Sequence, residues 1–519
     1  MSKILVADLS KQSISRDKAT DEHYGRGLAV HLLKEHTPLE CSRLSPDNAF
    51  IVVPGLFTGS LVSCATRAVV AARGDGGGRL AISNITGDFP QKLASLDLAA
   101  VVVKGKAETG NAVLYIDENE AKLLHLPELR DLTCGEIVEH LRSRFGNDAA
   151  IIGSGPIADM GLPLSNLFTS YPEGTPRYTC PRNSFGDVPG SKGLKAIVVK
   201  TSKYFAAPCA DKEALKQANR ELTQHLINDP ICGGALPGLG SITILHLLKN
   251  KEAIPSVVEK TTTAKHSQVE GRVNYTCAPL CAIGCLNRHS SSSNQVFAAP
   301  EVAEVRAAME HCFAVNFSEV DLDRLAAQLS ARGFELGLNT TEFINTVALY
   351  LQVKEEQVSE ENLTSLMEEI AAGSLLGRLL GSTTTGLGKL YPTDERIQAR
   401  ITRPANRNED EQQLKLDSLY PDFKSLDDLD LLYRQVFLVE NLGICIFTAF
   451  ALLNKKDTMD LLVELYSHKT GQPANAEDLL HYAGSCLAAE EALQRESALA
   501  GVKRSIPEFV KVLYTYFSA

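Results

Sequence analysis

The sequence lacks three features that would place the protein in a membrane, in a secretory pathway or on a nucleic acid. It contains no uninterrupted run of about 18 apolar residues, the length that spans a bilayer. Its amino terminus is broken by Lys3 and Asp8, so we expect no secretory signal peptide. Its 52 basic residues are fewer than its 63 acidic ones, and the net charge of −11 argues against a protein that tracks nucleic-acid phosphates.

The remaining composition is that of an ordinary globular protein, with 44% hydrophobic and 22% charged residues. A chain of 519 residues predicts more than one domain. Tryptophan is absent, whereas cysteine occurs 12 times. Because no secretory signal is expected, these thiols predict a reducing compartment, in which cysteines stay free or bind metal. We therefore expect a cytoplasmic protein.

The amino-terminal part differs in pattern from the rest of the chain. It contains short β-branched runs of strand length, separated by glycines and by a helical pattern at 133–145. From about residue 205, apolar residues recur at the i, i+3, i+4 spacing of helices. The order predicts an α+β amino-terminal domain followed by two mostly α-helical domains. The expected boundaries are 1–203, 204–385 and 386–519, and no internal repeat is evident.

Four cysteines form the most informative pattern. Cys277, Cys281 and Cys285 lie close together, and Cys445 lies far downstream. Three close thiols and one remote thiol are a common way to hold a cubane iron–sulfur cluster, which implies one-electron chemistry. The two gaps of three residues match neither the bacterial ferredoxin run nor a zinc ribbon. On spacing alone, the alternative that these thiols fill a core stays open.

Four amino-terminal segments combine glycine with basic or amide side chains. Glycine allows backbone N–H groups to approach an anion, and arginine offers a planar fork that suits phosphate. The alternative is that these are ordinary hairpin and bulge glycines. None of the segments fits a P-loop or a dinucleotide-binding fingerprint. The segments are 24–29, 54–78, 83–88 and 181–195.

Taken in this order, the segments and the cysteines resemble the tungsten-dependent aldehyde:ferredoxin oxidoreductase family. The resemblance covers about residues 1–340 and 425–450. Its most specific parts are Gly-Ser-Lys-Gly-Leu-Lys-Ala-Ile at 190–197 and Leu-Gly-Ile-Cys at 442–445. The other matching motifs lie at 25–29, 54–59, 102–107, 153–158, 277–285, 335–340 and 440–441.

The resemblance implies a fold and a function. The amino-terminal domain would form a base for a tungsten or molybdenum ion held by two pyranopterins, and the helical domains would cover it. One [4Fe-4S] cluster would lie beside the pterins and pass electrons to ferredoxin or to an iron–sulfur subunit. In this family an aldehyde and water give a carboxylate, two electrons and protons. The partners implied are thus a small substrate and an electron-transfer protein, and an oligomer is compatible with them.

The resemblance also implies roles for individual residues. The cluster ligands would be Cys277, Cys281, Cys285 and Cys445. The pterin phosphates would be lined by Arg67, Asn84, Gly87, Arg182 and Asn183, with a magnesium ion held by the carbonyls at Asn84 and Asn183. One pterin would meet Glu440, Gly443 and Ile444. The other would meet Phe334, Gly337 and Leu338.

Several departures from the family fall on these same motifs. The first cysteine gap has three residues where the family has two, and Ser184-Phe185 replaces a glycine pair. Phe334 stands at an acidic position of the family, and phenylalanine cannot accept a hydrogen bond from a pterin N–H. A buried donor left unpaired costs roughly 1–3 kcal/mol. The adjacent Glu335 is a candidate replacement.

The substrate side departs further, because no histidine lies between residues 339 and 440, where the family has a stretch ending in histidine. Glu301 and Glu304 fall where the family has a Pro-Glu-Tyr-Glu-Thr element, so we predict them as proton-transfer residues. The alternative is that they are solvated helix carboxylates.

Two functions therefore stay open. The chain is either an oxidoreductase that resembles this family, or a non-catalytic scaffold or electron-transfer subunit with a decayed pterin site. A radical enzyme that uses S-adenosylmethionine is disfavoured, because it needs cysteine gaps of three and then two residues and would leave Cys445 unused.

Overall fold

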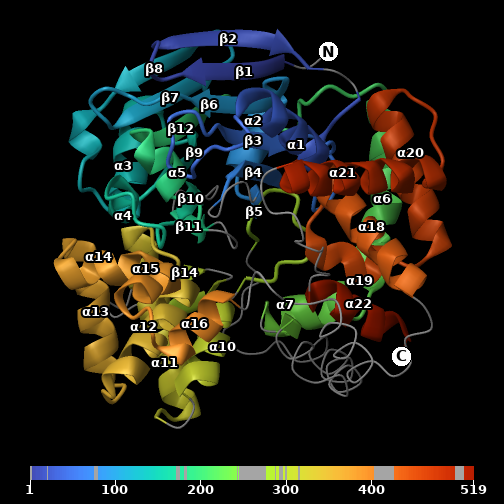
Figure 1. The fold of residues 1–519 in the computed structure, drawn as a ribbon. Coiled ribbons are helices and arrows are strands. Elements are labelled where there is room, and N and C mark those ends of the chain that lie inside the picture. The colour runs from blue at the N-terminus through green and yellow to red at the C-terminus, as the bar shows by residue number, and fades with distance from the viewer. Residues whose placement is uncertain are drawn as a thin grey trace.

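A computed structural model shows two sheets at one end of the molecule, one group of helices beside them and a second group beneath them (Figure 1). None of the described helices is both long enough and apolar enough to cross a bilayer. The structure describes the whole chain except residues 1–2, 20–21, 75–79, 171–175, 180–183, 242, 245–275, 287, 291–295, 299–300, 314–315, 403–425, 497–507 and 519.

The first sheet has the strand order β2-β1-β6-β3-β4-β5. Its strands are β1 (Lys3–Asp8), β2 (Ser13–Lys18), β3 (Phe50–Pro54), β4 (Ala68–Arg73), β5 (Leu80–Ile85) and β6 (Leu98–Lys104). Strands β1 and β6 pair in parallel, and the other neighbouring pairs of this sheet are antiparallel. Strands β3 and β4 are buried along their whole length, which explains why their sequences are continuous apolar runs.

The second sheet repeats this topology, with the strand order β11-β10-β9-β12-β7-β8. Its strands are β7 (Ala112–Asp117), β8 (Ala121–His125), β9 (Ala150–Ser154), β10 (Leu167–Ser170), β11 (Pro176–Thr179) and β12 (Leu194–Lys200). The parallel pair is β12 with β7, again the last strand of the unit against its first. The structure therefore contains a duplicated unit, although no repeat is evident in the sequence.

The two sheets pack face to face, with a helix on each outer side. Leu5 and Val52 of the first sheet share an apolar core with Leu114 and Ile152 of the second. Alternate residues of each strand point outward, toward α1 (Gly25–His36) over the first sheet and α3 (Cys134–Phe145) over the second. The short helices of this region are α2 (Phe89–Ser95), α4 (Pro156–Asp159) and α5 (Asp187–Ser191), with a 3-10 turn η1 at Pro127–Leu129.

One helical group, green and orange to red in Figure 1, joins segments that are distant in the chain. Its members are α6 (Lys212–Asn228), the π-helical turn η2 (Ile231–Ala235), α7 (Leu236–Leu239), α18 (Leu426–Leu442), η3 (Ile446–Thr448), α19 (Ala449–Leu452), α20 (Lys456–Thr470), α21 (Ala476–Glu496) and α22 (Glu508–Ser518). Buried side chains of α6, such as Leu222, pack in one core with Leu438 of α18 and Leu462 of α20.

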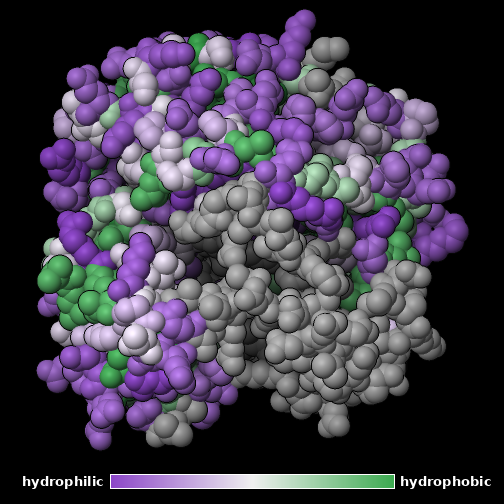
Figure 2. All heavy atoms as spheres, in the orientation of Figure 1, coloured by the Kyte–Doolittle hydropathy of each residue, from purple (hydrophilic) through white to green (hydrophobic). Residues whose placement is uncertain are grey.

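The other helical group, yellow to light orange in Figure 1, is continuous in sequence. Its members are α10 (Glu301–Phe313), α11 (Glu319–Leu336), α12 (Thr340–Lys354), α13 (Glu360–Ala372), α14 (Leu375–Gly381), α15 (Thr383–Leu390) and α16 (Glu395–Thr402). A two-stranded hairpin of β13 (Arg288–Ser290) and β14 (Val296–Ala298) precedes it. Figure 2 shows mostly hydrophilic side chains on the visible described surface, with an apolar area over α13 and α14. Leu375, at the start of α14, is 90% exposed.

This architecture confirms the predicted α+β amino-terminal part followed by helices. The boundaries at residues 203 and 385 stay predictions about chain segments. Packing sorts the helices differently, because α6 shares a core with the helices after residue 425 and α16 shares one with α10–α15.

Each helical group is attached to a sheet where a helix ends on a glycine. Helix α18 is followed by Gly443 (φ +78°), which packs against Gly55 at the end of β3. Helix α11 is followed by Gly337 (φ +68°), which packs against Gly155 at the end of β9. The left-handed backbone and the close approach both require glycine.

We predict that Gly337→Ala destabilises the fold more than Gly110→Ala. Both glycines have a left-handed backbone, but a Cβ at Gly337 would lie 2.7 Å from the backbone nitrogen of Gly155, whereas a Cβ at Gly110 would meet nothing within 4 Å. Overpacking costs about 1–3 kcal/mol. Thermal unfolding should show a clearly lower first transition for Gly337→Ala than for Gly110→Ala, and equal transitions would contradict the prediction.

Candidate functional site

The structure brings the cysteine triplet together with Cys445, which is distant from it in sequence. Cys277, Cys285 and Cys445 are buried, and Cys281 is partly buried. Burial and the neighbouring Cys281, Cys277 and Cys445 all raise the pKa of Cys285. The pKa of Cys277 is also raised, first by a hydrogen bond with Cys281 and then by burial. The raised pKa values mean that Cys277 and Cys285 hold their protons tightly, so a cation that binds these two thiols must displace the protons.

The loop between β3 and β4 connects the cysteine triplet to Cys445. The backbone N–H of Cys64 donates to the carbonyl of Leu280, 2.9 Å away, next to the triplet. The carbonyl of Cys64 accepts a hydrogen bond from the N–H of Cys445, also at 2.9 Å. An antiparallel bridge between Ala65 and Ile444 extends this contact. One strand-like loop therefore holds both parts of the site in register.

The sulfur atoms of the site have hydrogen-bond donors close to them. Arg67 Nη2 donates to Cys445 Sγ at 3.2 Å, and the N–H of Gly284 donates to Cys281 Sγ at 3.5 Å. The hydroxyl of Thr86 lies 3.8 Å from Cys277 Sγ. Donors of this kind stabilise thiolates, and hydrogen bonds to sulfur tune iron–sulfur clusters.

The donor set fits a cluster better than a single metal ion. Within the described part of the chain, no three or more His, Cys, Asp or Glu side chains are arranged to hold one ion. A cubane cluster binds each cysteine to a different iron, so its ligand sulfurs do not converge on one point. Four neighbouring thiols with a guanidinium at one sulfur provide the ligand type that such a cluster needs.

A buried ion-pair network lies beside the cysteines, around Glu440 at the end of α18. One Glu440 oxygen accepts from Arg26 Nη1 at 2.7 Å, and the other accepts a short hydrogen bond from Asn84 Nδ2. Arg26 also donates to both carboxylate oxygens of Glu490, at 2.9 and 2.7 Å, and lies over the ring of Phe437. Burial opposes the charge of Arg26, but Glu490 and Glu440 raise its pKa overall.

The ion-pair network around Glu440 offers only one of its polar groups to a pterin. Both oxygens of Glu440 are already engaged by Arg26 and Asn84, so the carboxylate is satisfied within the protein. Asn84 Oδ1, in contrast, is buried and has no hydrogen-bond partner among the described residues. A buried acceptor without a partner suits a ligand that donates a hydrogen bond.

The side expected for the second pterin does not fit the acidic contact of the family. Phe334 is 2% exposed and packs with Ile137 and Leu141 of α3. The candidate replacement Glu335 accepts a hydrogen bond from the N–H of Gly135 at the start of α3, at 3.2 Å. Phenylalanine in an apolar core offers no acceptor to a pterin.

The positions where the family has paired glycines also carry side chains that are used within the protein. Ser184 keeps a left-handed backbone (φ +42°), and its hydroxyl accepts from Asn339 Nδ2 at 2.8 Å. Phe185 is fully buried between the two sheets.

The other predicted site residues are placed as follows. Gly87 has φ +104°, and a Cβ there would lie 2.6 Å from the carbonyl oxygen of Ser170. Leu338 bridges to Ser165, as Ile444 bridges to Ala65. Glu304 is exposed on α10. Arg182, Asn183 and the side chain of Glu301 lie outside the described residues, and all of these roles stay predictions.

Sequence reasoning missed two residues that the structure places at the site, Arg26 and Cys64. Arg26 lies in the glycine-rich segment 24–29, whose pattern does not indicate an ion pair, and its pairing with Glu440 and Glu490 spans three helices. Cys64 is isolated from the other cysteines in sequence, so no spacing rule identifies it.

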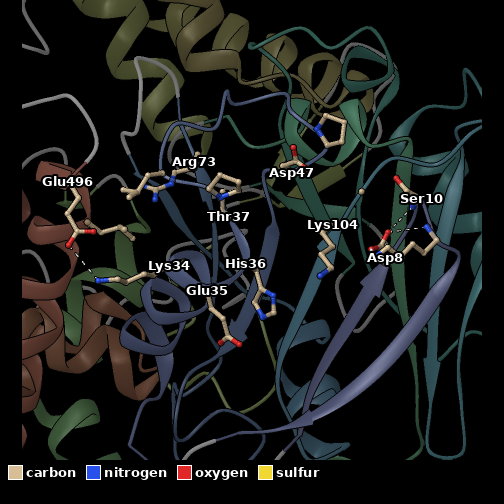
Figure 3. Close-up of a pocket in the computed structure, with 16 residues that line it drawn as sticks. Asp8, Ser10, Lys34, Glu35, His36, Thr37, Asp47, Arg73, Lys104 and Glu496 are labelled. Carbon is tan, nitrogen blue, oxygen red and sulfur yellow. Dashed lines mark hydrogen bonds and ion pairs between the residues drawn. The ribbon is translucent and has the colours of Figure 1, made fainter.

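A separate surface pocket of about 690 Å³ lies away from the predicted site residues (Figure 3). Its lining mixes charges of both signs, with Lys34 paired to Glu496 at 3.6 Å. His36 lies there too, and burial with a smaller contribution from Lys104 lowers its pKa. This balance of charge favours neither an anionic nor a cationic ligand.

Comparison with known proteins shows which sequences and structures this chain resembles. Residues 4–201 match the family described as aldehyde ferredoxin oxidoreductase, N-terminal domain. The tungsten-containing aldehyde ferredoxin oxidoreductase of Thermococcus kodakarensis is 26% identical over 339 residues, which are 64% of this chain and 54% of that protein. That of Pyrococcus furiosus is 27% identical over 351 residues, 65% of this chain and 55% of that protein. The chain thus spans about half the length of these relatives.

A solved structure shares the fold over the whole chain. It is a chain of the active-site complex BamBC of benzoyl coenzyme A reductase in complex with 1,5 dienoyl-CoA, with a TM-score of 0.74 and 16% sequence identity. The match covers 100% of this chain and 94% of that one, and at this identity it shows the fold alone. In sequence, the chain is similar to the tungsten-containing aldehyde ferredoxin oxidoreductases over about two thirds of its length, and the family model for their N-terminal domain matches residues 4–201.

Proposed function

We propose that this protein is an oxidoreductase in which Cys277, Cys281, Cys285 and Cys445 hold a [4Fe-4S] cluster. The observation that carries the proposal is the gathering of these thiols in one buried site beside Arg67. Electrons would leave a small substrate through the cluster. The proposed reaction is the oxidation of an aldehyde, as the relatives' name states. One aldehyde and one water give one carboxylate, two electrons and three protons.

Arg67 has a defined task in this proposal. Its side chain donates to Cys445 Sγ, and its backbone is held on both sides, because its N–H donates to the carbonyl of Gly443 and its carbonyl accepts from Gly55. A cluster with four thiolate ligands is anionic, so a guanidinium fixed at one sulfur favours its binding. The same positive charge raises the reduction potential of the cluster.

A tungsten- or molybdenum-bispyranopterin would supply the two-electron chemistry when bound. Asn84 Oδ1 and Gly87 would face it from the first sheet, with Gly443 and Ile444 from the end of α18. Gly337 and Leu338 would face it from the end of α11. A magnesium ion between the pterin phosphates belongs to the same proposal, and so does proton transfer by Glu301 or Glu304.

The electron acceptor that we propose is ferredoxin or another iron–sulfur protein in the cytoplasm. The support is the name of the curated relatives, which are ferredoxin oxidoreductases. A complex with a separate electron-transfer subunit fits equally well, because the solved structure with this fold belongs to a complex.

The contacts of Phe334 and Glu440 favour a second candidate function. Phe334 is buried among apolar side chains, and both carboxylate oxygens of Glu440 accept hydrogen bonds, one from Arg26 and one from Asn84. Both acidic contacts to pterins are therefore missing or already used. Without these two acidic contacts, the chain would be an electron-transfer or scaffold subunit that keeps the cluster and lacks the pterins.

Metal analysis separates the two candidates. Protein purified without oxygen, from cells supplied with tungstate and molybdate, should contain about four irons and about one tungsten or molybdenum per chain if it is the enzyme. Iron without tungsten or molybdenum would favour the electron-transfer subunit. A protein with none of these metals would contradict both candidates.

We predict that Cys445→Ala lowers the iron content, because the fourth corner of the cluster loses its thiolate. Iron should fall from about four to about three per chain, measured on protein purified without oxygen. The matched control is Cys209→Ala, which removes a partly buried thiol that donates to the carbonyl of His468 outside the site. Unchanged iron in Cys445→Ala would show that Cys445 is no ligand.

A further inference from the structure

Cys64 is an additional thiol of the cysteine site, with no role assigned by the spacing of the other four. Its side chain is 1% exposed. Its backbone is left-handed (φ +61°), a conformation that residues other than glycine keep only where the surroundings hold them. The hydrogen bonds to Leu280 and from Cys445 are the contacts that hold it. The residue is thus fixed between the triplet and the fourth cysteine.

The sulfur of Cys64 lies in the environment of a ligand sulfur. The N–H of Ala282 donates to Cys64 Sγ at 3.3 Å, and the N–H of Gly284 donates to Cys281 Sγ at 3.5 Å. One short loop therefore provides a backbone donor to each of the two sulfurs. Backbone N–H groups of this kind are the usual hydrogen-bond partners of cluster thiolates.

The thiols of Cys64 and Cys281 are direct neighbours. The two side chains are joined by a hydrogen bond between the thiols. Cys281 is also the most exposed of the four predicted ligands, whereas Cys64 is almost completely buried. At this corner of the site, two sulfurs are available where one iron needs one.

We propose that Cys64 is an alternate ligand for the iron that Cys281 binds. In the exchange, the Cys64 thiol loses its proton and forms an iron–sulfur bond. The bond from iron to Cys281 breaks, and Cys281 takes up the proton, so no electron is transferred. The proposal rests on the cluster that the proposed function contains. It adds a fifth cysteine, from the amino-terminal part of the chain, to four predicted ligands that all come from the helical part.

The test compares iron content and electron paramagnetic resonance of holoprotein variants purified without oxygen and without added thiols. Alanine is used because it cannot bind iron. Cys64→Ala and Cys281→Ala should each keep about four irons per chain, because the remaining thiol fills the corner. The double variant should fall to about three irons and show the signal of a three-iron cluster after oxidation. Cys445→Ala is the matched control, since we assign no spare thiol to its corner.

Two outcomes overturn the proposal. Cys281→Ala with as little iron as the double variant would show that Cys64 does not bind, and a double variant with four irons would show that neither thiol binds that iron. If the double variant does not fold, Cys281→Ala against Cys445→Ala decides the question, because only the former should keep four irons. Wild-type protein without iron would instead overturn the proposed cluster itself.

Discussion

The close contact of helix ends with strand ends is the constraint on which the site depends. Gly443 approaches Gly55, and Gly337 approaches Gly155, with backbone against backbone in both cases. No side chain fits into these contacts, so each helical group can approach its sheet this closely only through glycine. The N–H of Arg67 reaches the carbonyl of Gly443 through the first contact, and Cys445 reaches Cys64 two residues later. The contact between Gly443 and Gly55 therefore sets the position of Cys445.

The duplicated unit makes the two contacts between helix ends and sheets comparable, and they differ in polarity. Beside the first sheet, the Glu440 carboxylate contacts Arg26 and Asn84. Beside the second sheet, Phe334 lies in the apolar core under α3. One contact is polar and largely satisfied, and the other is apolar. The cysteines lie next to the polar contact, where Arg67 provides a positive charge.

Several features were predictable because they depend on local pattern. β-Branched runs such as 49–53 and 99–103 became buried strands, since a strand buried on both faces needs a continuous apolar sequence. The helical periodicity after residue 205 was likewise reliable. The duplication of the sheets was not predictable, because strand order is decided by hydrogen bonds between distant segments. The grouping of α6 with α18–α22 was missed for the same reason, since chain order does not determine which apolar faces meet.

The sequence by itself determined the types of element and the family resemblance, and it predicted four thiols as a set. Motif order and residue chemistry are enough for these inferences, because they do not depend on distance. Tertiary structure alone decided that Arg26 engages Glu440 and Glu490, that Phe334 is buried against α3, and that Cys64 joins the cysteine site. Each of these is a contact between residues far apart in the chain. Such contacts arise from packing and hydrogen bonding across the whole fold, which no local pattern encodes.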